Sequence, residues 1–121
     1  MRLLVLNVDR DDDLGRKAKV KSPVVGRENN IRAAERLALA DPEDSDVNSL
    51  FAAVSIYDEL KVDGEDVEIA TICGHISVGI KSDRIIAQQL EDVLDLTKVD
   101  EVILVTDGAE DEYILPIIQS R

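Results

Sequence analysis

The chain has 121 residues, and its 26 acidic and 14 basic side chains give a formal net charge of −12. A nucleic-acid partner is therefore not expected, because a chain this negative would repel phosphates. The length fits one domain, and a hydrophobic content of 45% excludes general disorder. A single cysteine excludes a disulfide framework within the chain, and no apolar run is long enough to span a bilayer. We therefore expect one soluble domain over residues 1–121.

Three short apolar runs predict strands that are buried on both faces. They lie at residues 3–8, 69–73 and 102–106. Helical patterns separate them, and strands that alternate with helices are typical of a parallel sheet with right-handed crossovers. We therefore expect an α/β fold, with a Rossmann-like or flavodoxin-like parallel sheet of three or four strands, in the order 2-1-3, flanked by helices.

Apolar residues at three- and four-residue steps predict the helices. These are residues 28–40, ended by Pro42; residues 47–60, with Asp44 or Ser45 as N-cap; and a helix that opens at Ser82 or Asp83 and buries Ile86, Leu90, Val93 and Leu94. A last helix is expected from Asp111 or Glu112, with Pro116 near its start. Its pattern shows no stop signal before Arg121, so the chain is expected to be a fragment of a longer protein.

Acidic residues crowd the ends of two predicted strands. The first strand leads into Asp9-Arg10-Asp11-Asp12-Asp13, and the third leads into residues 107–112, which include four more acids. Parallel strands end at the same edge of a sheet, and crowded carboxylates favour a hard cation with oxygen ligands. We therefore expect Mg²⁺ or a similar divalent cation at Asp9, Asp11, Asp107 and Asp111. The alternative is that these side chains point to water as turn residues and helix caps.

A connection of about 18 residues between Arg10 and Arg27 is longer than most βα loops, and such loops tend to be functional or disordered. Residues 16–36 contain seven basic side chains against two acidic ones. These cations either pair with the acidic edge or hold the phosphate of a ligand whose metal the carboxylates bind. The candidate ligand-binding residues are Arg10, Arg16 and Lys17, with Gly74 and Gly108 after the second and third strands.

Smaller features are expected to be structural. Cys73 lies in an apolar strand and is expected to be an inert buried thiol. His75 is expected to be a polar loop residue. The stretch Asp46-Val47-Asn48 is most simply the solvent side of its helix.

Three longer stretches resemble an archaeal family, the domain-of-unknown-function family 373. They are VDRDDDLGRK at residues 8–17, LADPEDSDVN at 39–48 and DGAEDEY at 107–113. The resemblance covers essentially the whole chain and implies the cytoplasmic, N-terminal part of a protein that lies in the cell membrane. Membrane contact would then be made only through a C-terminal region absent from this chain. The family implies no activity and no catalytic residue.

The order of several residues is also similar to that of haloacid-dehalogenase-type phosphatases. The matching positions are Asp9 and Asp11, Thr71, Lys81, and Asp107 with Asp111. The resemblance implies that Asp9 is the nucleophile, Asp11 the general acid and Lys81 the neutralising charge, with Mg²⁺ held by the later pair. Asp13 departs from this pattern, because Thr or Val is usual there, and so does Thr106, which replaces a usual Gly.

Three classes of function therefore remain open. The domain could be a binding module for a divalent cation and a phosphate-bearing ligand or nucleotide, which it senses for an attached membrane region. The first alternative is a Mg²⁺-dependent phosphohydrolase. The second is a non-catalytic assembly or dimerisation domain, which implies a homo-oligomer whose function lies on the helix faces.

Overall fold

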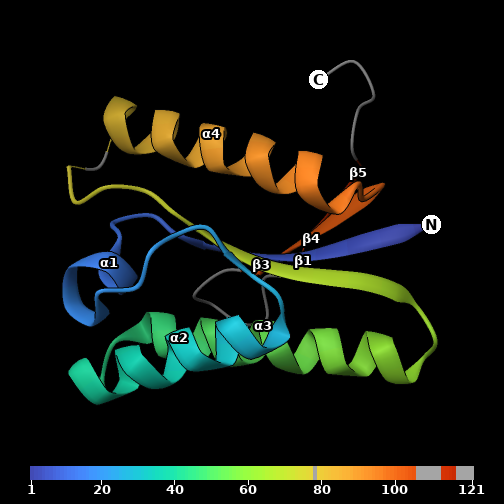
Figure 1. Ribbon diagram of the computed structural model, residues 1–121, viewed down its shortest axis with the longest axis horizontal. Coiled ribbons are helices and arrows are strands. Elements are labelled where there is room, and N and C mark those ends of the chain that lie inside the picture. Colours follow the sequence, from blue (N-terminus) through green and yellow to red (C-terminus); the bar gives the residue numbers. More distant parts are fainter. Residues whose placement is uncertain (78, 106–112, 117–121) are drawn as a thin grey trace.

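The computed structural model describes residues 1–77, 79–105 and 113–116. A twisted sheet forms the middle layer, α2 and α3 cover one face, and α4 covers the other (Figure 1). The elements in chain order are β1 (Arg2–Asp9), α1 (Asp13–Ala18), β2 (Val24–Val25), α2 (Arg27–Ala40), α3 (Ser45–Val62), β3 (Asp66–Cys73), α4 (Ile80–Thr97), β4 (Glu101–Val105) and β5 (Tyr113–Pro116). The predicted α/β class is confirmed.

The described strands form one sheet in the order β2-β3-β1-β4-β5. Its centre, β3-β1-β4, is parallel and contains the three predicted strands in the predicted order 2-1-3. Both edges differ from the prediction, because β2 pairs antiparallel with β3 and β5 pairs antiparallel with β4. The sheet is therefore mixed, and its two additional strands are too short to stand out as apolar runs.

The helix expected from Asp111 or Glu112 is wrong over residues 113–116. These residues form β5, which runs antiparallel to β4 with Pro116 opposite Glu101. The sequence Tyr-Ile-Leu favours a strand, and a proline is tolerated at a sheet edge because an edge strand bonds on one side only. Residues 106–112 and 117–121 lie outside the described part of the chain.

The long connection after β1 contains regular structure, contrary to the expectation of a loop. Asp12 caps α1 by accepting a hydrogen bond from Gly15 N, and the helix ends at Lys19 in the left-handed conformation. Leu14 and Ala18 are buried in a core shared with α2, α3 and Cys73. Their burial stabilises the connection against the rest of the domain.

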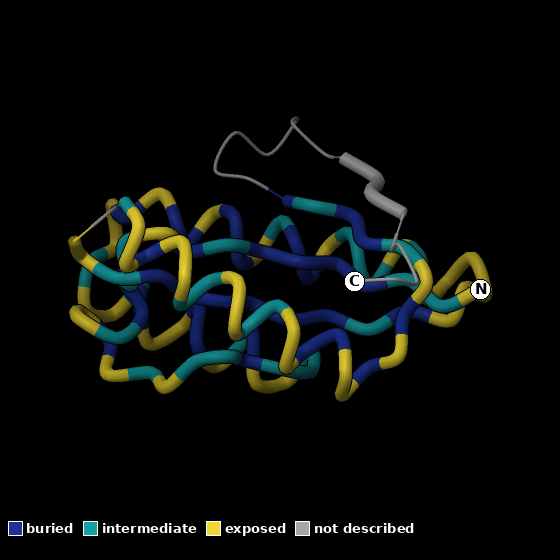
Figure 2. The backbone as a smooth tube through the Cα atoms, turned by 90° about the horizontal axis from the view of Figure 1, so that it is seen from above, coloured by how far each residue is buried: buried dark blue, intermediate teal, exposed yellow. Residues whose placement is uncertain are grey.

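Alternation along β1 decides which side chains meet which helices. Leu4 and Leu6 pack toward α4, whereas Val5 packs in the core beneath α3. Asn7 and Asp9 follow Val5 at two-residue steps and therefore share its face. Figure 2 shows the result, in which buried strands lie between helices whose outer faces are exposed.

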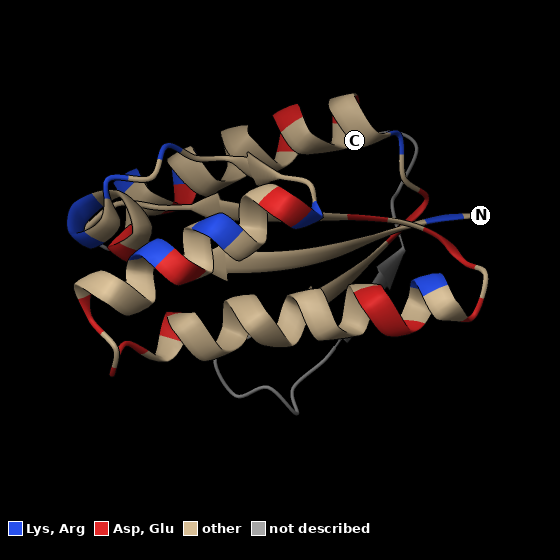
Figure 3. Cartoon of the chain, turned by 60° about the horizontal axis from the view of Figure 1, so that its bottom comes forward, with Lys and Arg blue, Asp and Glu red and all other residues tan. Residues whose placement is uncertain are grey.

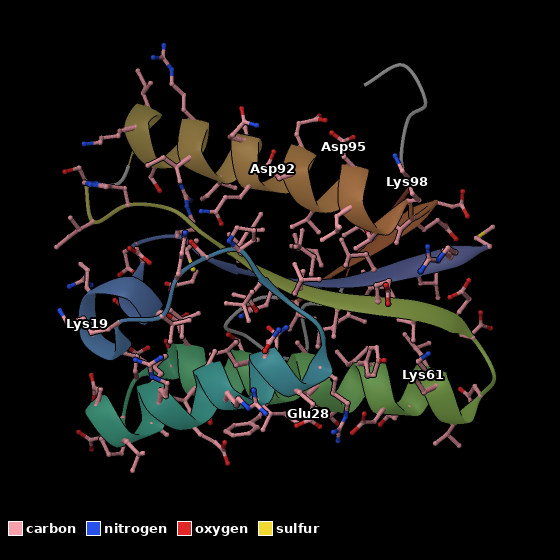
Figure 4. All side chains as sticks on the ribbon, viewed as in Figure 1. Lys19, Glu28, Lys61, Asp92, Asp95 and Lys98 are labelled. Carbon is pink, nitrogen blue, oxygen red and sulfur yellow. The ribbon has the colours of Figure 1, made fainter. Side chains whose placement is uncertain are left out.

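The other three predicted helices are confirmed with small shifts at their ends. α3 begins at Ser45 with Asp44 as its N-cap, and α4 begins at Ile80, two residues before the predicted start. Asp92 and Asp95 are exposed residues of α4 (Figure 4). In the part of the chain that the structure describes, no helix is both long enough and apolar enough to cross a membrane.

Candidate functional site

Four carboxylates meet where β1 ends. One oxygen atom from each of Asp9, Asp11, Asp13 and Asp46 lies within 4.8 Å of the others. Asp9, Asp13 and Asp46 are buried, and Asp11 is half-buried. We call these four residues the carboxylate cluster. It joins the end of β1 to the first turn of α1 and the first turn of α3.

Asp9 is held by the start of α1. Its Oδ1 accepts a hydrogen bond from Asp13 N at 3.1 Å, and its Oδ2 accepts one from Leu14 N at 2.9 Å. The first amides of a helix lack partners within the helix, so a carboxylate there is stabilised. Burial nevertheless raises the pKa of Asp9 above its ordinary value, although these two bonds oppose the rise.

Asp13 holds its proton more tightly than an ordinary carboxylate. Burial is the largest cause that raises its pKa to about 6, and a hydrogen bond with Asp44 and the negative charge of Asp11 add to it. A hydrogen bond with Asp46 acts in the opposite direction. The cluster therefore favours protons or another positive charge at its centre.

Two cations of α1 supply part of the positive charge that the carboxylate cluster favours. Arg16 Nη2 donates a hydrogen bond to Asp13 Oδ1, and it lies 3.9 Å from Asp11 Oδ2. Lys17 Nζ lies 2.8 Å from both Asp41 Oδ2 and Asp44 Oδ2, in the turn between α2 and α3. Both side chains are therefore engaged with acids, which fits the ion-pairing interpretation of the basic segment.

Asp46 is the residue that sequence reasoning missed. Asp46 and Val47 are buried, so the prediction that residues 46–48 face solvent is wrong for both and holds only for Asn48. The N-cap Asp44 accepts a hydrogen bond from Asp46 N at 2.9 Å and orients this first turn of α3. The capping signal at Asp44 was readable in the sequence, but the approach of α3 to the end of β1 was not.

The predicted metal ligands Asp107 and Asp111, and the predicted ligand-binding Gly108, lie outside the described residues. β4 ends at Val105, which is paired with Asn7. Of the predicted metal ligands, the structure brings together Asp9 and Asp11 and adds Asp13 and Asp46.

Arg10 and Gly74 lie beside the end of β1, outside the carboxylate cluster. Arg10 Nη2 lies 3.2 Å from Asp83 Oδ1, and both side chains are exposed. A Cβ atom on Gly74 would collide with Arg10 O and Ser82 Oγ. Gly74 N donates to Asp9 O at 2.8 Å, so this glycine allows β3 and α4 to approach β1 closely.

Thr71 belongs to a buried network beneath α2. Its hydroxyl donates to Asn30 Oδ1 at 2.6 Å and accepts from Asn7 Nδ2 at 3.4 Å. Asn30 Nδ2 donates to the carbonyls of Val24 and Gly26, which fixes the orientation of its amide. The network therefore leaves Asn7 Oδ1 as a buried acceptor with no hydrogen-bond partner.

Cys73 is free and buried, as predicted. Its Sγ lies 3.6 Å from Asp9 Oδ2, and burial followed by the charge of Asp9 raises the pKa of the thiol. Asp9, Asp12 and Cys73 form a second group with metal-ligand spacing. A thiol that stays protonated at neutral pH is a poor ligand, so the all-carboxylate group is the better candidate.

The remaining position of the phosphatase pattern is Lys81, which is exposed in the first turn of α4. Within the described residues it makes no hydrogen bond or ion pair with Asp9. The phosphatase order of residues is thus spread over three environments: the carboxylate cluster, the network beneath α2 and the exposed start of α4.

Comparison with known proteins identifies relatives of this chain. It is 60% identical over 118 residues to an uncharacterized protein of Archaeoglobus fulgidus and 51% identical over 119 residues to one of Methanocaldococcus jannaschii. Each alignment covers 98% of this chain but only 34% and 32% of the relatives, so the chain spans about a third of their length. No solved structure matches. The family described as Domain of unknown function (DUF373) matches residues 2–121, and the chain belongs to this family.

Proposed function

We propose that the domain binds a divalent cation, Mg²⁺ or a similar hard ion, through Asp9, Asp11, Asp13 and Asp46. The observation that carries this proposal is the meeting of four carboxylates within 4.8 Å, three of them buried. Buried carboxylates destabilise a fold unless protons or cations neutralise them. Hard divalent cations prefer such all-oxygen ligands.

A second observation on the same face of β1 supports the proposal. Asn7 lies two residues before Asp9, and its Oδ1 is a buried acceptor that lacks a partner. Such an oxygen is satisfied by a water molecule or by a cation and its hydration shell. Asp107 and Asp111 remain proposed as further ligands from the end of β4.

A phosphate-bearing ligand or nucleotide is proposed to bind at the cation. Among the predicted ligand-binding residues, Arg16 is placed best for this role, because its guanidinium already lies against Asp11 and Asp13. Mg²⁺ commonly binds through one or two carboxylates together with phosphate oxygens. The domain would then report a ligand to the remaining two thirds of a longer protein, whose attachment to a membrane is part of this proposal.

The phosphohydrolase alternative is less favoured by the geometry. Both oxygens of Asp9 accept amide hydrogen bonds, and the residue is 1% exposed, which is a poor position for a nucleophile. Thr71 is engaged with Asn30 in the buried network. The assembly alternative, a homo-oligomer, gains no specific support from these contacts.

Melting in the presence of MgCl₂ or CaCl₂, against a chelated reference, tests the cation site. Saturating metal should stabilise the wild-type domain, by about 3 kcal/mol at one hundred times Kd. The effect should be lost in Asp46→Asn and kept in Glu43→Gln, which removes an exposed carboxylate three residues away. An unchanged wild type, or equal losses in both variants, would contradict the proposal.

A further inference from the structure

A second feature, which shares no residue with the carboxylate cluster, lies beside α2. It is a cavity of about 280 Å³ between α2 and residues 20–25, and its charged lining consists of Lys21, Arg32 and Arg36. We call it the basic cavity. We propose that the basic cavity binds a small phosphate-bearing molecule.

Helical spacing brings the cations of α2 to one wall. Asn29, Arg32 and Arg36 follow one another at three- and four-residue steps, which places them along one stripe of the helix. Lys21 reaches the cavity from the opposite wall. Figure 3 shows blue bands on α2 and on the segment that leads into it.

The walls are held in place by hydrogen bonds that need no ligand. Asn29 Nδ2 donates to Val25 O at 2.9 Å, and Arg36 Nη2 donates to Lys19 O at 3.3 Å. The segment 20–25 is also anchored through Val24, which pairs with Thr71 in the sheet and is buried. Figure 4 places Lys19 at the end of the molecule formed by α1. A cavity with both walls fixed in this way is preorganised for binding.

The three cations of the basic cavity have no carboxylate partner in the described part of the chain. Five cations of the described chain lie within 4.0 Å of a carboxylate: Arg2, Arg10, Arg16, Lys17 and Arg27. Among residues 1–77, 79–105 and 113–116, no carboxylate lies within that distance of Lys21, Arg32 or Arg36. The lining of the cavity contains no acidic residue at all.

Three cations around one cavity repel each other, and in a chain with net charge −12 they could easily have been paired with acids. An anion between them would relieve this repulsion. Guanidinium groups present paired N–H donors whose geometry matches two oxygens of a phosphate, and a lysine adds a point charge. The arrangement therefore favours a phosphate group over a neutral ligand.

The volume and the lining of the basic cavity limit the class of ligand further. A volume of about 280 Å³ is near the lower end of small-molecule sites, enough for one or two phosphate groups on a short carbon skeleton. The lining contains no aromatic side chain on which a nucleobase could stack. Pro23 and Val24 provide an apolar surface for the carbon part. We expect a small phosphorylated metabolite, recognised by its phosphate.

Pyrophosphate is the probe for the test, measured by calorimetry and by amide chemical shifts in excess chelator. The chelator removes divalent cations, so the result does not depend on the carboxylate cluster. Saturable binding is expected, with shifts concentrated in residues 20–36. Arg32→Gln should weaken it about tenfold, since one charge-assisted contact is lost.

Arg84→Gln is the matched control, because Arg84 is an exposed arginine of α4 on the opposite side of the sheet. It should bind pyrophosphate as the wild type does. Arg32 makes no hydrogen bond or ion pair within the described chain, so its replacement should leave the melting temperature unchanged. Three results would overturn the proposal: no saturable binding, equal weakening by Arg84→Gln, or equally tight binding of citrate.

Discussion

Lys17 Nζ lies 2.8 Å from Asp44 Oδ2, and this contact joins α1 to the start of α3. The other oxygen of Asp44 accepts a hydrogen bond from Asp46 N, so the same ion pair helps to position Asp46 in the carboxylate cluster. Lys17 also forms an ion pair with Asp41, the C-cap residue of α2. One ammonium group thus connects the segments that build the cluster.

Replacing Lys17 with methionine should lower the free energy of unfolding and weaken the response to Mg²⁺. The side chain of Asp44 is only 4% exposed and would lose its cation. The bond from Lys17 is the main cause that lowers the pKa of Asp41, and the pKa of Asp44 is lowered although burial opposes this. Urea unfolding at neutral pH, with and without Mg²⁺, measures both effects.

The ion pair has a defined pH window. Because the folded pKa values of Asp41 and Asp44 are depressed, its contribution is present above about pH 4 and is lost as the pH falls through the lower folded values. Lys19→Met is the control, since Lys19 is exposed and, among the described residues, its ammonium donates only to the carbonyl of Arg16. Wild-type stability in Lys17→Met would show that the contact has no structural role.

Protons and a divalent cation should compete for the carboxylate cluster. Burial raises the pKa of both Asp9 and Asp13, the latter to about 6 from 3.8. Without metal, the folded protein then binds more protons than the unfolded chain between about pH 4 and pH 6, so its stability should fall as the pH rises through that window. Mg²⁺ displaces these protons, and its effect on the melting temperature should be larger at about pH 7.5 than at about pH 5.

Melting curves at the two pH values, with and without Mg²⁺, check this. In Asp46→Asn, the Mg²⁺-induced rise in melting temperature should no longer differ between the two pH values. A Mg²⁺ effect of the same size at both values would mean that the ion binds elsewhere.

Asn30→Leu should destabilise the domain by about 2 to 4 kcal/mol, because it removes hydrogen bonds from several buried polar groups. The carbonyls of Val24 and Gly26 would lose a donor, and the hydroxyl of Thr71 would lose its acceptor. Chemical denaturation gives the difference. Asn48→Leu, on an exposed site of α3, should change stability by about 0.5 kcal/mol or less. Similar changes in the free energy of unfolding for both variants would show that the network does not stabilise the domain.

Gly74→Ala should destabilise the domain by about 2 kcal/mol, because the added methyl collides with Arg10 O and Ser82 Oγ. Ser82→Ala in the same chain relieves one collision but leaves the rigid carbonyl. The double variant should therefore stay less stable than Ser82→Ala alone in denaturant unfolding. Equal stability of these two would show that the strand end shifts freely to make room.

Local patterns predicted most of the secondary structure. The apolar runs of β1, β3 and β4, the spacing of α2 and α3, and the N-cap of α3 depend on neighbours along the chain, so they could be predicted without the fold. The pattern at β5 does not distinguish a strand from a helix, because four residues that include a proline carry too little periodicity. α1 and β2 could not be predicted, because they are short and lie in a connection whose composition is typical of a loop.

For the candidate site, the sequence by itself determined that carboxylates follow β1 and that a basic segment comes next, since both are contiguous runs. It could not show that Asp46 turns inward to meet Asp9, or that Arg16 and Lys17 are paired while Arg32 and Arg36 line a cavity. Those distinctions depend on which face of each helix packs against the sheet. Only the tertiary structure decides this, because packing brings together residues that are dozens of positions apart.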